Sequence, residues 1–253
     1  MPSPGVSLIV VTRDEEQLIG QCLSSAKRFC RELIVVDSFS TDRTVAICEE
    51  LGARVFQQEF AGYVLQKQAA LDRATSEWVL LLDADEQVTY ELGCEIERAI
   101  NSADRYDGYR IQRVLYHLRH YYVRPLYRDF PVRLFRRARA HIGGIDPHDK
   151  VIVDGPVGRL RAPILHFSYR DVADHIATIN RFTTRSAERL EPSPLDALKM
   201  LTHPIGRFLN VYLLRGGFLE GGPGLYAAMT GAFYGFVKYA KLYERRLAQR
   251  RPR

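Results

Sequence analysis

Apolar and polar positions alternate in blocks over the first hundred residues, and the blocks have the lengths of strands and helices. Short apolar runs at 6–11, 32–37, 53–57 and 78–83 are typical of buried parallel strands. The segments between them repeat apolar residues at helical spacing. Strand and helix alternation with short links predicts right-handed crossovers and a mostly parallel sheet with helices on both faces.

The first helix should begin near Asp14, because Gln17 three residues later completes a capping-box pattern. The apolar face of this helix would comprise Leu18, Ile19, Cys22, Leu23 and Ala26. Further helices are expected at 44–52, 65–74 and 89–101.

Beyond residue 101 the pattern changes to shorter strands, which predict a mixed or antiparallel extension. The segment 171–190 predicts a helix capped by Asp171. Its apolar face would comprise Val172, Ile176, Ile179, Thr183 and Leu190. The Pro- and Ser-containing stretch 191–194 is the best candidate for a boundary. We therefore divide the chain into 1–100, 101–190 and 191–253.

The composition describes an ordinary soluble core, with 46% apolar and 26% charged residues in 253. Four cysteines without paired or metal-type spacing fit a reducing, cytosolic setting, and no basic leader precedes the run at 6–11. Residues 1–100 carry 9 basic and 17 acidic side chains, whereas 101–139 carry ten arginines and three acids. A nucleic-acid module is more often basic throughout its folded part, so this distribution argues against nucleic-acid binding.

Acidic side chains follow the apolar strands at what should be one edge of the sheet. Asp37 ends one strand, and Asp83, Asp85 and Glu86 end another. Ligands bind at the carboxyl ends of parallel strands, and carboxylate oxygens favour hard divalent cations. We expect a dication with a bound diphosphate to compensate these acids; the alternative is that they only cap helices and form turns.

Four segments resemble the inverting family 2 glycosyltransferases with the GT-A fold: "SLIVVTRDEE", "LIVVDSFSTDRTVAICEELG", "QKQAAL" and "WVLLLDADE". Later segments, including "PVRLFRR", "PHDKV" and "ILHFSY", resemble the bacterial branch that adds glucose to the lipopolysaccharide inner core. The resemblance implies a nucleotide-sugar half at 1–100, an acceptor-binding and catalytic half at 101–190, and a membrane-associating helical extension at 191–253.

The resemblance also implies roles for residues of the donor site. Thr12, Asp14 and Glu15 would line the base and ribose, and Asp37 would accept from the uracil imide, which favours UDP. Lys67 or Gln68 would lie near the base or diphosphate and Asp83 at the ribose, and Ala84 is a further donor-binding position. The planar guanidinium of Arg133 suits a phosphate of the sugar diphosphate or of a phosphorylated acceptor, and a solvated strand face is the alternative. Asp85 would hold Mg²⁺ or Mn²⁺, with His166 as a further metal ligand.

An inverting transfer needs a carboxylate that takes the proton of the acceptor hydroxyl. Asp149 and Asp146 lie in a Gly- and Pro-rich loop after the strands. The resemblance favours Asp149, because histidine–acid pairs occupy this place in the lipopolysaccharide branch and His148 precedes it. Asp146 is the reserve candidate; either acid could instead be a turn residue.

The C-terminal segment is apolar and then basic. Residues 221–237 carry no charged side chain, but five glycines and Pro223 interrupt them, and 238–253 carry seven basic residues against one acid. This pattern favours a helix at an anionic membrane surface over a spanning helix. The alternative is a hydrophobic helical pair that packs on the catalytic domain and ends in a solvated tail. Together with the resemblance to the lipopolysaccharide branch, this pattern implies peripheral or monotopic attachment at the cytoplasmic face of a bacterial inner membrane.

Together these observations predict a metal-dependent transferase that moves a hexose, preferably glucose, from a UDP-sugar to a glycolipid, preferably the lipopolysaccharide inner core. One alternative keeps the reaction and takes a polyprenyl phosphate or capsule lipid as acceptor. Another is a non-catalytic scaffold at a lipid surface, against which the complete set of strand-end acids argues. A nicotinamide enzyme is disfavoured, because no GxGxxG motif follows the first strand.

Overall fold

The computed structural model describes residues 5–102, 106–122, 129–146 and 148–249, and the chain forms two compact units. The first comprises Met1–Val114 and Arg128–Phe167, and the second comprises Leu115–Tyr127 and Ser168–Arg253. The boundary therefore falls before the helix at 172 and not at 191–194, because this helix packs with the helices that follow it. The functions expected for the three sequence ranges stay predictions.

A seven-stranded sheet forms the centre of the first unit. Its strands are β12 (Val157–Arg159), β6 (Gly108–Arg110), β9 (Val132–Arg136), β4 (Trp78–Asp83), β1 (Val6–Thr12), β2 (Glu32–Asp37) and β3 (Arg54–Gln57), in this spatial order. Strand β9 runs antiparallel to both of its neighbours, and the other pairs are parallel. The mostly parallel sheet is confirmed.

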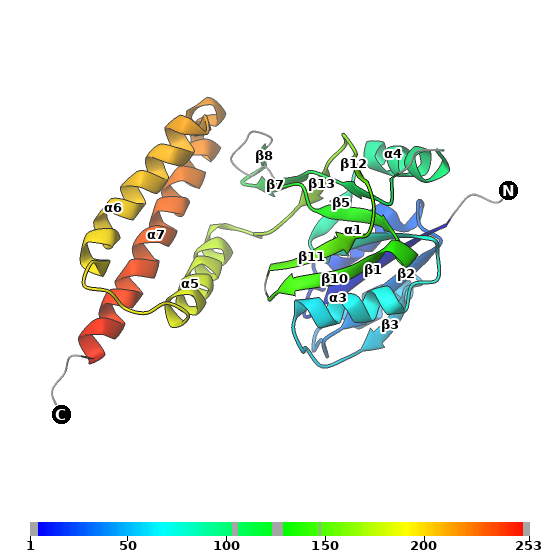
Figure 1. Ribbon diagram of the computed structural model, residues 1–253, viewed down its shortest axis with the longest axis horizontal. Coiled ribbons are helices and arrows are strands. Elements are labelled where there is room, and N and C mark those ends of the chain that lie inside the picture. Colours follow the sequence, from blue (N-terminus) through cyan, green and yellow to red (C-terminus); the bar gives the residue numbers. More distant parts are fainter. Residues whose placement is uncertain (1–4, 103–105, 123–128, 147, 250–253) are drawn as a thin grey trace. The chain divides into compact units, whose positions relative to one another are not determined.

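Helices cover the two faces of this sheet, so the inner strands are apolar on both sides. Helices α1 (Ile19–Lys27), α2 (Thr44–Glu50) and α4 (Tyr90–Asn101) contribute to one buried cluster, and α3 (Tyr63–Asp72) contributes to the other. The hairpin of β10 (Ala140–Ile145) and β11 (His148–Val153) lies beside α3 on this second face (Figure 1). Two short strands, β5 (Glu86–Val88) and β13 (Ile164–His166), pair antiparallel.

The start of α1 corrects the expected capping box. The helix begins at Ile19, and its N-cap residue Leu18 makes no side-chain cap hydrogen bond. Asp14 instead has a left-handed backbone with φ of 53°, and its carboxylate accepts a hydrogen bond from the backbone N–H of Thr41 at 2.7 Å. The loop after β1 is thus tied to the loop after β2, and this tertiary contact replaces the local cap.

The second unit is helical. It contains α5 (Val172–Glu188), α6 (Asp196–Leu209) and α7 (Gly221–Gln249), with short helical turns at Asn210–Leu214 and Gly217–Glu220. The second unit also contains most of β7 (Arg113–His117), which pairs with β8 (His120–Tyr122). In the first unit, a 3-10 turn at Arg137–Arg139 precedes β10.

The Asp171 cap of α5 is confirmed, because its carboxylate accepts from the N–H of Asp174 at 2.8 Å. The buried face of α5 is only partly as expected. It comprises His175, Ile179, Thr183 and Ala187, whereas Val172, Ile176 and Leu190 are exposed.

Helices α6 and α7 expose a long row of large apolar side chains. The row comprises Leu198, Leu201, Ile205 and Leu209 on α6 and Leu225, Met229, Phe233 and Phe236 on α7, spaced by three or four residues. This spacing puts the members of each helix on one face. Among the described residues, no helix has the length and apolarity that crossing a bilayer requires.

A buried cluster of rings joins β7 to the helices of the second unit. The hydroxyl of Tyr226 lies 2.8 Å from Nδ1 of His175 and 3.3 Å from Nε2 of His117. The His175 ring stacks on Tyr169 at 3.8 Å. Burial, together with the nearby His117, lowers the pKa of His175 from 6.5 to about 4, in spite of Asp174.

The depressed pKa of His175 predicts a loss of stability in acid. Between pH 6.5 and 4 the unfolded chain binds a proton at His175 that the folded chain does not, so stability is complete above pH 6.5 and falls across this window. The loss is at most about 3 kcal/mol, reduced by solvent screening. Urea unfolding followed by circular dichroism should show this fall in the free energy of unfolding in the wild type and in the control His203→Phe, but not in His175→Phe. Equal pH dependence of stability in all three proteins would contradict the prediction.

Candidate active site

The acids Asp83, Asp85 and Glu86 lie in and beside the tight turn that connects β4 to β5. Asp83 ends β4, Glu86 begins β5, and the backbone N–H of Asp83 donates to Oε2 of Glu86 at 2.9 Å. Ala84 between them is buried. The turn therefore keeps these carboxylates at the carboxyl end of an inner strand.

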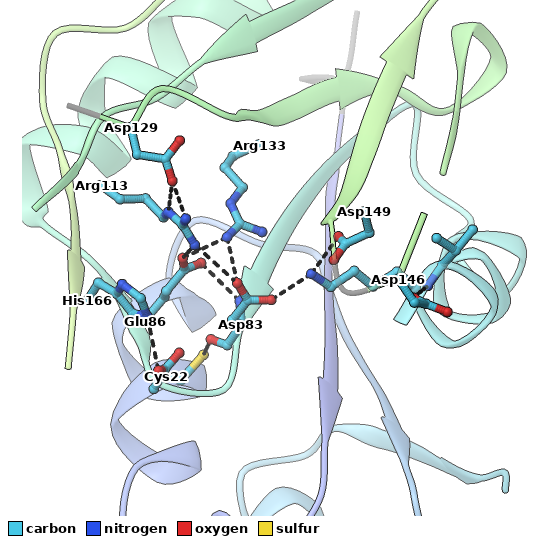
Figure 2. A network of polar contacts seen from close by, with 12 residues as sticks. Cys22, Asp83, Glu86, Arg113, Asp129, Arg133, Asp146, Asp149 and His166 are labelled. Atoms are coloured by element: carbon cyan, nitrogen blue, oxygen red, sulfur yellow. Dashed lines mark hydrogen bonds and ion pairs between the residues drawn. The ribbon is translucent and has the colours of Figure 1, made fainter. Parts of the chain in front are cut away.

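Asp83 lies between two cations from different elements (Figure 2). Nζ of Lys67 on α3 is 2.8 Å from Oδ1, and Nη2 of Arg133 on β9 is 2.7 Å from Oδ2. Burial alone would raise the pKa of Asp83, but the charges of Arg133 and Lys67 hold it well below its ordinary value. Asp83 is therefore ionised in the folded protein.

Glu86 is fully buried and shares the same arginine. Its Oε1 lies 2.7 Å from Nη2 of Arg133 and 3.3 Å from Nη1 of Arg113. Burial raises the pKa of Glu86, and the nearby Asp83 adds to the shift against the opposing charge of Arg133. Asp129 completes the row, since one of its oxygens accepts from Nε of Arg113 at 2.8 Å.

These contacts correct part of the expectation that a dication with a diphosphate compensates the strand-end acids. For Asp83 and Glu86 the compensating charges are internal, from Lys67, Arg113 and Arg133. Arg133, expected at a phosphate, is itself almost buried and serves as the counter-ion of both acids. The clue was present in the sequence, because the arginine-rich segment 101–139 follows an acidic half.

Asp85 has a different partner. Nε2 of His166 lies 3.1 Å from Oδ2 of Asp85, although the two residues are 81 positions apart. The antiparallel register of β13 with β5 sets this contact, since His166 pairs with Glu86 and the N–H of Phe167 donates to the carbonyl of Asp85 at 2.8 Å. Burial opposes the charged imidazole, but the hydrogen bond with Asp85 and its charge raise the pKa of His166.

The network as a whole contains more carboxylates than cations. Its five carboxylates are Asp83, Asp85, Glu86, Asp129 and Asp149, and its three strong cations are Lys67, Arg113 and Arg133. Three against five leaves a formal charge of −2 before His166 is counted.

Among the described residues no group of three or more potential ligands surrounds a metal position, so a dication would need further ligands from water or a bound phosphate.

The candidate base Asp149 lies on β11 and is oriented by Lys67. Nζ of Lys67 donates to Oδ2 of Asp149 at 2.8 Å and so joins it to Asp83, while Oδ1 accepts no hydrogen bond from a described residue. Gly144, opposite Asp149 in the hairpin, has φ of 101°, and a β-carbon there would collide with the carbonyl of His148. Glycine at this position therefore allows the hairpin shape that presents Asp149.

Asp146, the reserve candidate, has a structural partner. Its Oδ1 accepts from the N–H of Val64 at 3.1 Å, in the first turn of α3. The preceding Gly62 has φ of 111°, and a β-carbon there would collide with the Asp146 carboxylate. Asp146 thus caps a helix whose own N-cap residue offers no side chain.

Replacing Asp146 with alanine should destabilise the protein by about 0.5–2 kcal/mol, the usual effect of losing a helix N-cap. The rate per folded molecule should stay near that of the wild type, because Asp149 is unchanged. Chemical denaturation and initial rates would measure the two effects. A loss of several hundredfold in rate with normal stability would instead identify Asp146 as the base.

The residues expected at the nucleotide base lie on the neighbouring ends of β1 and β2. Thr12 and Asp37 are paired in register, and Oγ1 of Thr12 is buried with no hydrogen-bond partner among the described residues. Asp37 is buried and accepts from the N–H of Ser40 at 2.9 Å. The N–H of Glu15 donates to Oγ1 of Thr44 at 2.8 Å, so the two loops hold each other in place.

The side chain of Gln68 makes its hydrogen bonds away from the carboxyl ends of β1 and β2. Its Oε1 accepts from the N–H of Ile142 on β10 at 2.8 Å, and its Nε2 donates to Asp72 at 2.7 Å. Of the two neighbours Lys67 and Gln68, the structure brings Lys67 into the carboxylate network and uses Gln68 to hold the hairpin.

A mostly parallel sheet with acids at the ends of β2 and β4 and in the loop after β1 is the GT-A fold of glycosyltransferases. Residues 7–152, more than half of the chain, match Glycosyl transferase family 2. The chain belongs to this family and is a glycosyltransferase, which confirms the expected family and fold.

Relatives and solved structures agree with this assignment. The lipopolysaccharide core biosynthesis glycosyltransferase LpsC of Rhizobium meliloti is 30% identical over 263 residues, which cover 100% of this chain and 97% of LpsC. An uncharacterized glycosyltransferase of Rickettsia felis is 31% identical over 94% of this chain and 89% of its own length. The crystal structure of S. aureus TarS in complex with UDP-GlcNAc has a TM-score of 0.53 at 16% identity, covering 98% of this chain and 93% of that one.

Proposed function

We propose that this enzyme transfers a hexose, preferably glucose, with inversion from a UDP-sugar to a glycolipid of the lipopolysaccharide inner core, in a metal-dependent reaction. The observation that carries the proposal is the excess of carboxylates in this network, five against the three strong cations Lys67, Arg113 and Arg133, with Asp85 paired with His166 and not with a strong cation. LpsC, similar over the whole chain, is named for lipopolysaccharide core biosynthesis, which supports the acceptor. In TarS a fold of this kind holds UDP-GlcNAc, which supports a UDP-sugar donor.

Asp85 and His166 would hold the metal, and their donor atoms fit one. A carboxylate oxygen and an imidazole nitrogen lie 3.1 Å apart, and a mixed set of this kind suits Mn²⁺ better than the oxygen-preferring Mg²⁺. When bound, such an ion stabilises negative charge on a departing diphosphate. Thr12, with its unpartnered buried hydroxyl, and Asp37 would lie at the base, and Asp14 and Glu15 near the ribose.

Asp149 would act as the base. Oδ1 takes the proton of the acceptor hydroxyl while its oxygen forms a bond to the anomeric carbon, and the bond from that carbon to the diphosphate oxygen breaks. The new bond forms on the face opposite the leaving group, which inverts the anomeric centre and releases UDP. Lys67 keeps Oδ2 in place during the step.

A screen of nucleotide sugars tests the donor and acceptor classes. UDP-glucose with Mn²⁺ should give the largest thermal shift among UDP-, GDP- and CDP-sugars, and its labelled glucose should appear on lipopolysaccharide inner-core acceptors. A larger shift with GDP- or CDP-sugars would overturn the UDP assignment. Transfer only to polyprenyl phosphate would overturn the proposed acceptor.

The exposed apolar row on α6 and α7 supports attachment to the cytoplasmic face of a bacterial inner membrane. Lys241, Arg245 and Arg246 follow it on α7, and the last four residues of the basic tail lie outside the described residues. Apolar side chains followed by cations suit an anionic lipid surface. Leu201→Gln with Leu209→Gln should weaken sedimentation with phosphatidylglycerol vesicles; unchanged sedimentation would exclude this face.

A further inference from the structure

The helical unit contains a pocket that the proposed reaction does not use. It has a volume of about 410 Å³, within the range of about 300–1,000 Å³ typical of small-molecule sites, and it is lined by α5, α6, α7 and Tyr169. Gly231 and Gly235 on α7 leave room on one side. A β-carbon at Gly231 would lie 3.5 Å from Arg207, an ordinary contact, so a side chain there would enter the pocket without distorting the backbone.

The pocket has two cations and no acid. Arg207 on α6 and Lys238 on α7 both line it, and neither lies within ion-pair distance of a carboxylate among the described residues. None of its lining residues is aspartate or glutamate. His175 adds no charge at neutral pH, because burial lowers its pKa to about 4. A pocket with two uncompensated cations favours an anion, and the planar guanidinium of Arg207 suits the oxygens of a phosphate.

Flat rings form much of the remaining wall. The Tyr169 and His175 rings stack at 3.8 Å, His203 and Tyr239 lie 4.5 Å apart, and Nζ of Lys238 is 4.5 Å from the centre of the Tyr239 ring. A single phosphate would fill only a small part of the volume. Aromatic faces with a few hydroxyls suit a compact organic group that carries both apolar C–H and polar O–H surface, as a sugar ring does.

The pocket and the exposed apolar row occupy different faces of the same helices. On α6, Arg207 lies two residues from both Ile205 and Leu209, and on α7 Gly231 lies two residues from both Met229 and Phe233. Residues two apart do not share a helix face. A bilayer that contacts the apolar row therefore does not contact the pocket, which argues against the head group of a membrane phospholipid.

We infer that this pocket binds a phosphorylated saccharide, with the phosphate at Arg207 and Lys238 and the sugar ring against the aromatic wall. The ligand is either a free sugar phosphate or a phosphorylated sugar within a larger glycan. The inference goes beyond the proposed transfer reaction and does not depend on its donor, its metal or its base.

Isothermal titration of the full chain tests the inference with glucose 6-phosphate, inorganic phosphate and glucose as probes. Glucose 6-phosphate should bind saturably and at least about tenfold more tightly than either of the others, since each supplies only part of the contacts. Arg207→Gln with Lys238→Gln should weaken this binding by about tenfold or more, and Arg185→Gln, an exposed arginine of α5 outside the pocket, should not. Gly231→Leu, which fills the pocket and keeps both charges, should also abolish it.

Five results decide between the alternatives. Competition by a phosphorylated oligosaccharide but not by phosphatidylglycerol vesicles supports a glycan source, and binding of glucose 6-phosphate alone supports a free sugar phosphate. Equal affinity for inorganic phosphate, or binding of vesicles through Arg207 and Lys238, would overturn the inference. So would unchanged glucose 6-phosphate binding in both pocket variants, provided circular dichroism shows them folded. UDP-glucose binding, measured in parallel, reports separately on the proposed function.

Discussion

Replacing Asp149 with asparagine is expected to lower kcat by about 10²–10⁴-fold, the usual contribution of a positioned general base. Asparagine keeps the size of the side chain but cannot take the proton of an attacking hydroxyl. Binding of the donor should stay nearly intact, because Asp85 and His166, the proposed metal ligands, are unchanged. Steady-state rates and calorimetry with UDP-glucose would separate the two effects.

Asp154→Asn is the matched control for this experiment. Asp154 follows β11 directly and is exposed, so its loss of charge should leave kcat within about twofold. A thermal melt of Asp149→Asn must show a folded protein, because Lys67 loses one of its two carboxylate partners. Turnover near the wild-type rate in a folded Asp149→Asn variant would move the base to another residue.

Replacing Arg133 with methionine is expected to destabilise the first unit by about 3–5 kcal/mol, the effect of breaking a buried ion pair. The change leaves Asp83 and the fully buried Glu86 without their shared partner, while the methionine fills much of the same volume. Urea denaturation followed by tryptophan fluorescence would measure it, since Trp78 lies on the adjacent strand β4.

Arg136→Met on the same strand is the control. Arg136 pairs with Glu77 and Asp107 and lies over the Trp78 ring at 4.6 Å, but it is partly exposed, so its loss should cost only about 1–2 kcal/mol. Adding Glu86→Gln to Arg133→Met should restore part of the stability, because the uncompensated charge is removed. Equal losses in the two single variants, with no recovery in the double variant, would show that Arg133 is not the counter-ion of these acids.

The sequence predicted the sheet well because its signals are local. Strands at 32–37 and 78–83 have the expected bounds, since each is an apolar run that ends at an acid. The helix start at Asp14 was wrong for a tertiary reason: its carboxylate binds the N–H of Thr41, 27 positions away. A local pattern does not show that a distant loop competes for the same side chain.

The sequence predicted which residues belong to the candidate site, but it did not predict which of them contact one another. Strand-end acids, Lys67 and His166 were all selected from the sequence, and the structure brings them to one edge of the sheet. The contact of Lys67 with Asp149 joins residues 82 positions apart. Alternation along 132–136 predicts a strand with two faces, but it cannot distinguish a solvated arginine from the buried counter-ion that Arg133 is.

Calorimetric titration of UDP-glucose in Mn²⁺ and in EDTA tests the central claim most directly. If a dication that carries the donor diphosphate binds at Asp85 and balances the excess negative charge of the network, UDP-glucose binding should be tight in Mn²⁺ and lost both in EDTA and in Asp85→Asn. Affinity that is the same in all three conditions would contradict the metal-bound donor and leave the excess of carboxylate without the role proposed for it.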